Sequence, residues 1–248
     1  MFKWSKSDLI VIPLMLLIIS ASAVLLHFLL RNKKYYIRRI PLQIISLIVV
    51  VIEIIKQFYY RGNPDFTYYV LPLHFCSLFM VLMPLSQFFG HKVGSIFKPM
   101  TFVYSGLVTV LVLVNPNALI GQSTSDILGS FHNIHTFVFH FSVIAYFIFS
   151  IALSDYQPKF IHCINVTCGI VFYAVYAIPC SYRLQVNYVN ILYSFFEPLE
   201  KFRLWAGQVW YNIVLFAAGV IGACLICVIS TLIYKCCVKF INKKNFAE

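Results

Sequence analysis

Long apolar runs alternate with short polar connections along the whole chain. The runs fall near residues 8–30, 40–60, 71–89, 99–114, 134–153, 160–178 and 207–235. Most of them approach or exceed the roughly 20 residues that an α-helix needs to cross a hydrocarbon core of about 30 Å. The pattern therefore predicts an all-α, polytopic transmembrane helical bundle. We expect seven spans in a single integral membrane domain over residues 1–248.

The run at 99–114 is the weakest of the seven, because about 16 residues rise only about 24 Å along a helix. A six-span bundle without it is the alternative. The composition agrees with either arrangement: 61% of the residues are hydrophobic and 11% are charged, whereas a soluble domain has about a quarter charged. We expect an integral membrane protein, in the plasma membrane if bacterial and in an endomembrane if eukaryotic.

The net charge of +11 indicates orientation in the bilayer and contact with anionic lipid rather than nucleic-acid binding, because Lys and Arg lie in short connections and tails. Twelve of them lie on the side of the loop 31–39, and six on the other side. The positive-inside rule places that loop in the cytoplasm, the N-terminus outside and the C-terminus in the cytoplasm. The eight scattered cysteines do not indicate a disulfide framework.

A stripe of ionisable and polar residues marks the second run. Glu53, Lys56, Gln57 and Tyr60 recur at i, i+3, i+4 and i+7, which is one face of a helix. Ionisable residues inside a span usually face the bundle interior and mark a functional site. The alternative is a neutralised ion pair that only holds helices together.

The third run begins LPLHFC, with His74 and Cys76 two residues apart. On a helix the two side chains differ by about 200°, so they cannot act on each other directly. We expect Pro72 to open the helix, which places Cys76 near first-turn amides that favour a thiolate. The alternative is a small buried hydrophobe.

The fifth run begins FHNIHTFVFHF, where His132 and His135 share a helix face at i and i+3. His140 is turned by about 140° from His135, and we expect it to be a satisfied structural histidine. A Cys and a His on different helices at one depth fit a nucleophile and its base. A metal site at His132 and His135 with His74 or Asp126 is less favoured, because no dense ligand motif supports it. We expect no metal and no cofactor.

Three segments together resemble a known family: LPLHFC with the following Pro84, HNIHTFVFH, and QVNYVNILYSFFEP. They resemble the YwaF-like integral membrane proteins, which are related to a eukaryotic transmembrane ether-phospholipid acyltransferase. The resemblance implies seven helices, an acyl-accepting Cys76 and an essential histidine at His135. It also implies that Asn187, Tyr188 and Asn190 are positions of the family's sequence motif. The chain departs from the family pattern at Ser77, where bacterial members often have an acidic residue, and at Glu197-Pro198, which replaces a proline–tryptophan cluster.

These patterns favour a membrane-embedded lipid acyltransferase as the function. In this hypothesis Cys76 forms a thioester, His135 acts as its base and a lysophospholipid hydroxyl takes the acyl group. The supporting residues would be His74, His132, Glu53, Lys56, Asn187, Tyr188 and Asn190. The expected partner is a membrane phospholipid or lysophospholipid, not nucleic acid. Two alternatives remain: a small-solute transporter or channel, in which Glu53 would be essential and Cys76 replaceable, and a non-catalytic scaffold.

Overall fold

The computed structural model describes residues 4–61 and 67–245, and within these ranges the secondary structure is helical, without a β-strand. The α-helices are α1 (Asp8–Leu30), α2 (Tyr35–Arg38), α3 (Ile40–Arg61), α4 (Phe79–Gln87), α5 (His91–Val114), α6 (Phe131–Ala152), α7 (His162–Leu184), α8 (Glu197–Ala206) and α9 (Gln208–Asn245). Short 3-10 helices lie between them: η1 (Tyr68–Val70), η2 (Phe75–Leu78), η3 (Pro116–Ala118), η4 (Gly121–Thr124) and η5 (Tyr188–Asn190). The all-α class predicted from the apolar runs is confirmed.

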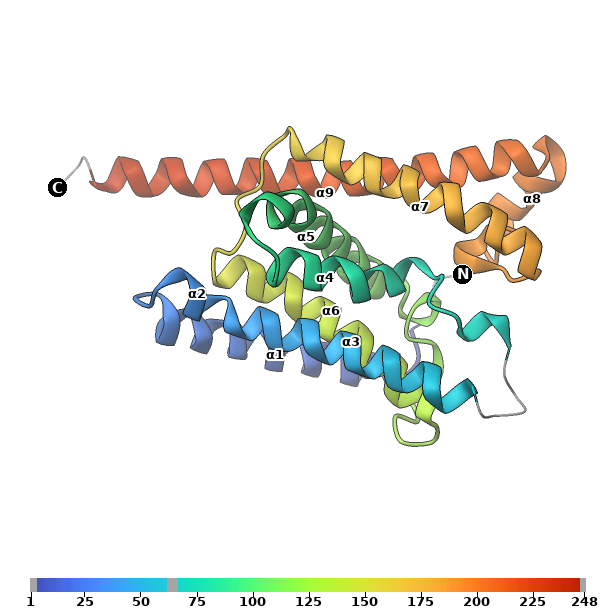
Figure 1. The fold of residues 1–248 in the computed structure, drawn as a ribbon, viewed down its shortest axis with the longest axis horizontal. Coiled ribbons are helices and arrows are strands. Elements are labelled where there is room, and N and C mark those ends of the chain that lie inside the picture. Colours follow the sequence, from blue (N-terminus) through green and yellow to red (C-terminus); the bar gives the residue numbers. More distant parts are fainter. Residues whose placement is uncertain (1–3, 62–66, 246–248) are drawn as a thin grey trace.

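The long helices form a layered bundle. Figure 1 shows α7 and α9 in one layer and α1, α3 and α6 in another, with α4 and α5 between them. The contacts agree, because α5 packs against α4, α6, α7 and α9, while α6 packs against α1 and α3. Residues 31–34, 88–90 and 153–161 lie at one end of the bundle, which we call the basic end, and residues 67–78, 115–130 and 185–207 lie at the other, which we call the pocket end.

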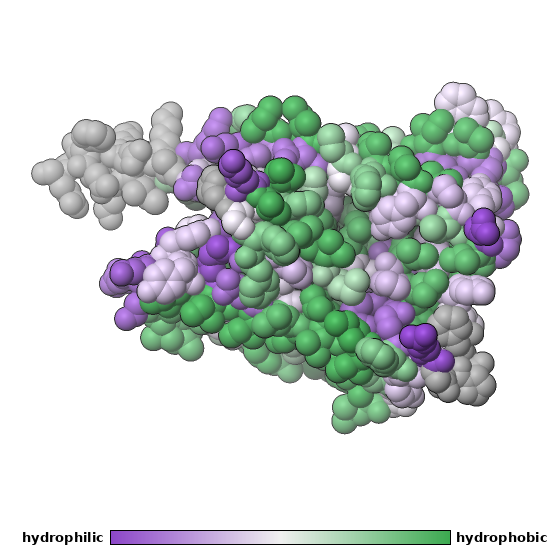
Figure 2. Space-filling view, viewed as in Figure 1, coloured by the Kyte–Doolittle hydropathy of each residue, from purple (hydrophilic) through white to green (hydrophobic). Residues whose placement is uncertain are grey.

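The outer surface between the two ends is apolar. Figure 2 shows a broad hydrophobic band, with hydrophilic side chains gathered toward the ends. Six helical segments of the described chain are long and apolar enough to cross a membrane: Asp8–Leu30, Tyr35–Arg61, Lys92–Val114, Phe131–Ala152, His162–Leu184 and Gln208–Cys237. A soluble monomer rarely exposes such a surface, and its height suits a bilayer. The protein is an integral membrane protein, as its composition predicts.

The short crossing is not the one that the sequence indicated. Helix α5 begins at His91, so its 24 residues rise about 36 Å, which is enough for a full crossing. The apolar run at 71–89 instead contains a shorter apolar helix, Phe75–Gln87, because residues 67–74 form the 3-10 helix η1 and turns. The chain still passes from the pocket end to the basic end through this segment (Figure 1).

A buried carboxylate connects several elements at the basic end. Asp155, in the segment between α6 and α7, is 8% exposed. It accepts hydrogen bonds from the Lys98 ammonium at 2.7 Å, the Gln87 amide at 2.9 Å and the Tyr35 hydroxyl at 3.2 Å. These partners belong to α5, α4 and α2. Sequence spacing carries no signal for this cluster, because the partners of Asp155 are distant from it in the chain.

Candidate functional site

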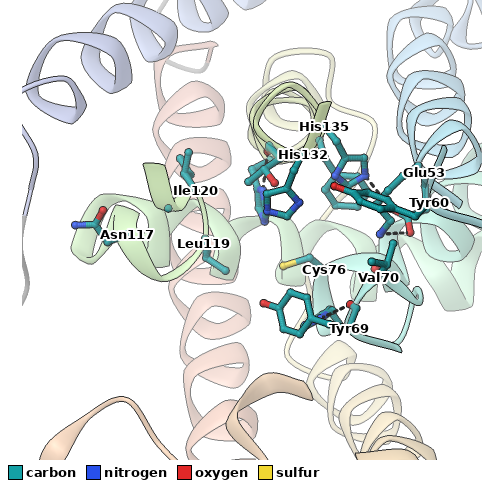
Figure 3. Close-up of a pocket in the computed structure, with 17 residues that line it drawn as sticks. Glu53, Tyr60, Tyr69, Val70, Cys76, Asn117, Leu119, Ile120, His132 and His135 are labelled. Carbon is teal, nitrogen blue, oxygen red and sulfur yellow. Dashed lines mark hydrogen bonds and ion pairs between the residues drawn. The ribbon is translucent and has the colours of Figure 1, made fainter. Parts of the chain in front are cut away.

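A cavity of about 290 Å³ opens at the pocket end, between α3, α6, the segment 69–77 and the loop 117–121 (Figure 3). Its lining concentrates polar side chains at this end of the bundle. They include a carboxylate, an ammonium, a thiol and several histidines: Glu53, Lys56, Cys76, His74, His132, His135 and His140. A cavity of this size suits the polar part of a small ligand or the ester region of a lipid rather than a whole lipid.

Helix α3 supplies an ion pair to this cavity. Glu53 and Lys56 are 1% and 8% exposed, and the Glu53 Oε1 lies 2.6 Å from the Lys56 Nζ. Gln57 donates from Nε2 to the same carboxylate oxygen at 3.1 Å and to the Val70 carbonyl at 2.9 Å. The i, i+3 and i+4 spacing thus brings three polar side chains to one buried face. Gln57 also fixes the segment that carries Cys76 to α3.

His135 of α6 completes this charged cluster, because its Nε2 lies 3.0 Å from the Glu53 Oε2. A carboxylate accepts hydrogen bonds, so Nε2 donates its hydrogen to Glu53. In that tautomer the Nδ1 atom carries a lone pair and can accept a proton. The ring is further held by stacking on Phe139, with centroids 5.5 Å apart.

Cys76 lies in η2, on the second residue of that helix, and is half-buried. The helix begins at Phe75, so Pro72 does not open it as we expected but lies in the preceding turn. In Figure 3 the Cys76 side chain points away from Glu53, toward the space between His132 and Tyr69. Cys76 and His135 both line the cavity, although no hydrogen bond joins the thiol to a histidine among the described side chains.

His74 and His132 have different positions in the cavity wall. His74 donates from Nε2 to the Tyr69 carbonyl at 3.2 Å, and its ring makes edge contacts with Tyr69 and Tyr188, with centroids 4.5 and 5.0 Å apart. His74 therefore supports the turn that precedes Cys76. His132 is exposed, so it lies where the cavity meets its surroundings.

The motif residues Asn187, Tyr188 and Asn190 lie outside the cavity lining in the described part of the chain. Tyr188 is fully buried, and its hydroxyl donates to the Tyr68 carbonyl. The Asn187 Oδ1 accepts hydrogen bonds from the amides of Leu192 and Tyr193 at 2.8 and 3.3 Å. Asn190 adopts a φ of 62°, a left-handed conformation that Asn tolerates better than most residues. The motif thus builds a tight turn that holds the segment before Cys76.

The segment after this turn is fixed by its own ion pair. Glu200 of α8 accepts hydrogen bonds from the Arg203 guanidinium at 2.5 and 2.9 Å and from the Ser194 amide at 2.9 Å. The hydrogen bonds from Arg203, with that from Ser194, lower the pKa of Glu200 to about 2. The carboxylate therefore stays charged over the whole physiological range.

His140 differs from the expectation of a satisfied structural histidine. Its Nδ1 lies 2.8 Å from the Thr136 carbonyl oxygen, but its Nε2 is buried without a hydrogen-bond partner among the residues that the structure describes. His135 and His140 project from different faces of α6, yet both line the cavity. The reason is that the cavity wraps around the first turns of α6, reaching the His132, His135 and Phe139 side as well as the Thr136 and His140 side.

Sequence reasoning missed several cavity residues. Tyr69, Asn117 and Thr136 line the cavity, and the spacing of apolar residues carries no signal for the loop that brings Asn117 there. The metal alternative finds no support in geometry, since the described residues contain no group of three or more His, Cys, Asp or Glu side chains placed to hold an ion.

Comparison with known proteins identifies a family for this chain. The model of the TMEM164 family matches residues 1–234, which is nearly the whole chain and includes every cavity residue. No curated protein and no solved structure matches the chain. A match of this extent, together with the apolar helices of the bundle, identifies the protein as a membrane protein that belongs to the TMEM164 family.

Proposed function

We propose that the protein is a membrane-embedded lipid acyltransferase that carries an acyl group on Cys76. The observation that carries the proposal is the 3.0 Å hydrogen bond between Glu53 and His135 in the same cavity as a thiol. A nucleophile, a base and a third group that orients the base form the arrangement that covalent catalysis requires. The resemblance of the LPLHFC and HNIHTFVFH segments to YwaF-like proteins supports the same reading.

In the first half of the reaction, the His135 Nδ1 takes the proton of the Cys76 thiol, directly or through one water. The thiolate attacks the ester carbonyl carbon of a phospholipid, so a C–S bond forms and the ester C–O bond breaks. His135 then returns the proton to the departing lysophospholipid oxygen. Glu53 stabilises the imidazolium that forms in between, as the acidic member of a catalytic triad does.

In the second half, a lysophospholipid hydroxyl attacks the thioester, and the acyl group passes from sulfur to oxygen. The segments that line the cavity lie at the pocket end of the apolar bundle, a depth that suits the ester groups of a bilayer. It is bordered by Tyr60 and Tyr69, and tyrosines are enriched at this depth of a membrane. Acyl chains would remain in the lipid while the ester enters the cavity.

The test is acyl exchange between a phospholipid and a lysophospholipid in vesicles that contain the purified protein. We expect Cys76→Ala to abolish exchange, and His135→Ala to lower its rate by about 10²- to 10⁴-fold, as loss of a general base does. Cys168→Ser is the matched control, because Cys168 is an exposed cysteine outside the cavity, and it should exchange like the wild type. Full exchange by Cys76→Ala would contradict the proposal. A transporter would instead lose solute transport in Glu53→Gln and keep it in Cys76→Ala.

A further inference from the structure

A second cavity, of about 410 Å³, lies at the basic end of the bundle, where the segment between α6 and α7 passes α9 (Figure 1). We call it the basic groove, and six residues line it: Gln157, Pro158, Lys159, Phe160, Tyr234 and Lys235. The segment between the helices supplies the first four, and α9 supplies the last two. The basic groove is separate from the cavity that contains Cys76, which lies at the other end of the bundle.

The basic groove carries two cations, because it is lined by Lys159 and Lys235, and both are exposed. The Lys235 Nζ lies 4.5 Å from the ring centroid of Phe160. This cation–π contact holds the ammonium beside the segment that carries Lys159. Neither lysine forms an ion pair with a carboxylate among the residues that the structure describes. The two positive charges are therefore available to an anion from outside the protein.

The described carboxylate at the basic end is already engaged elsewhere. The side chain of Asp155 is 2% exposed and pairs with Lys98 and Arg39. The other carboxylates in the described ranges lie toward the pocket end: Asp8, Glu53, Asp126, Glu197 and Glu200. The anion that suits the basic groove is therefore a ligand rather than a side chain of the described bundle.

The depth of the basic groove in the membrane suits a lipid headgroup. Lys235 belongs to the segment Gln208–Cys237, which is long and apolar enough to cross a membrane. It lies 27 residues after Gln208, which corresponds to about 40 Å along α9. A bilayer with its headgroup regions is about 40 to 45 Å thick. The lysines of the groove thus lie at the level where lipid phosphates are the abundant anions.

The remaining residues of the basic groove fit the same kind of ligand. Gln157 and Tyr234 each carry a hydrogen-bond donor that a phosphate oxygen can accept. Phe160 is 44% exposed, and with Pro158 it gives the groove an apolar wall. A molecule with a phosphate next to an apolar part matches this combination better than a free inorganic anion does.

We propose that the basic groove binds the phosphate headgroup of an anionic phospholipid. The ammonium groups of Lys159 and Lys235 bind the phosphate oxygens, while the apolar wall packs against the glycerol and the first methylenes of the acyl chains. Basic pockets between membrane-spanning helices bind anionic headgroups in this way. A zwitterionic lipid fits less well, because its own ammonium neutralises the phosphate. The inference is independent of the proposed acyl transfer, since the groove shares no residue with the cavity of Cys76.

A bound headgroup has a mechanical consequence for the bundle. It connects α9 to the segment between α6 and α7, which are otherwise held together here by the contact of Lys235 with Phe160 and by the hydrogen bond from the Cys227 thiol to the Lys159 carbonyl. A ligand that binds the folded state alone stabilises that state in proportion to its concentration and affinity. Anionic lipid should therefore raise the midpoint of thermal unfolding.

The experiment uses the purified full chain in a neutral detergent. Phosphatidylglycerol is the anionic probe, because phosphate is its only charge, and phosphatidylcholine is the zwitterionic control. Binding is measured by native mass spectrometry, and stability by the midpoint of thermal unfolding. A lysine near anionic lipid contributes about fivefold in affinity, so phosphatidylglycerol should bind at least about tenfold more tightly than phosphatidylcholine. Equal binding of the two lipids would overturn the proposal.

A pair of matched double variants distinguishes the groove from general surface charge. Lys159→Gln with Lys235→Gln should weaken phosphatidylglycerol binding more than about tenfold and remove the rise in the unfolding midpoint. Lys33→Gln with Lys34→Gln removes the same charge from exposed residues at the same end, outside the groove, and should bind like the wild type. Equal weakening in both double variants would overturn the proposal.

Two soluble probes test whether the ligand is a lipid or a free phosphate. Inorganic phosphate and glycerophosphoglycerol carry the anion without acyl chains, and each should bind at least about tenfold more weakly than phosphatidylglycerol, because the apolar contacts are lost. Phe160→Ala, which keeps both lysines, should reduce this preference for the lipid. Inorganic phosphate binding as tightly as phosphatidylglycerol would overturn the proposal and identify a free-phosphate site.

Discussion

The Lys98 ammonium lies 2.7 Å from the Oδ1 of Asp155 at the basic end of the bundle. The carboxylate side chain is 2% exposed and the lysine side chain 14%. The Nε of Arg39 lies 3.8 Å from the same oxygen, so one carboxylate forms ion pairs with two cations. Asp155 therefore connects the α6–α7 segment to α5 and to the start of α3, at the end of the bundle opposite the cavity.

Removing this carboxylate should strongly destabilise the bundle. Asp155→Asn keeps the size of the side chain but leaves Lys98 and Arg39 without their anion, and loss of one partner of a buried pair costs roughly 3 to 5 kcal/mol. We expect a clear fall in the midpoint of thermal unfolding in detergent. Adding Lys98→Met should recover part of the loss, because the pair is then removed as a unit.

The control for Asp155 is another carboxylate in an ion pair. Glu197 lies 2.7 Å from Lys201, but both side chains are more than 70% exposed. Exposed pairs contribute at most about 1 kcal/mol, so Glu197→Gln should unfold close to the wild type. Equal midpoints for Asp155→Asn and Glu197→Gln would show that the Asp155 network does not stabilise the fold.

The two members of the cavity ion pair should not be equivalent. Glu53→Gln leaves the Lys56 ammonium buried without an anion, whereas Lys56→Met leaves the Glu53 carboxylate with the hydrogen bonds from His135 and Gln57. We therefore expect Glu53→Gln to lower the free energy of unfolding more than Lys56→Met does, by up to roughly 3 kcal/mol. The double variant should be more stable than Glu53→Gln. The midpoints of thermal unfolding in detergent are compared for the two single variants and the double variant. A lower midpoint for Lys56→Met than for Glu53→Gln would contradict this account.

The helices could be predicted from the sequence because each long apolar run has one physical use, to span the bilayer. The prediction failed where helical length and apolar length differ. Helix α5 starts at His91 and includes Lys92 and Lys98, so its first turns carry charged side chains. The apolar run at 99–114 is therefore shorter than the helix. Residues 67–74 are apolar enough to extend the next helix, yet they form turns, and the Tyr68 carbonyl there accepts a hydrogen bond from the Tyr188 hydroxyl.

The site could be predicted only in part. The spacing of Glu53 and Lys56 predicted that the two side chains share a helix face. The FHNIHTF segment predicted a histidine near the same end of the bundle. The hydrogen bond between Glu53 and His135 joins residues 82 positions apart, and periodicity within one helix carries no information about the neighbour of that helix. The different contacts of the two His140 nitrogens are likewise not specified by sequence spacing.

The orientation of the bundle in the membrane stays a prediction, and its test uses the two ends of the structure. Lys33 is an exposed residue at the basic end, and Leu128, at the pocket end, is 84% exposed. The excess of Lys and Arg at the basic end favours the cytoplasmic side for it. In sealed membranes with the cytoplasmic face inward, an impermeant maleimide should label Leu128→Cys and leave Lys33→Cys unlabelled until the membrane is opened.

The native cysteines provide an internal control for this labelling. Cys236 and Cys237 are exposed near the end of α9 that points toward the basic end (Figure 1), so they should be protected together with Lys33→Cys. Labelling is therefore read as the increase over the wild type, before and after the membrane is opened. If Lys33→Cys, Cys236 and Cys237 react in sealed membranes while Leu128→Cys does not, the bundle has the opposite orientation. The cavity would then face the cytoplasm and take its lipids from the cytoplasmic leaflet.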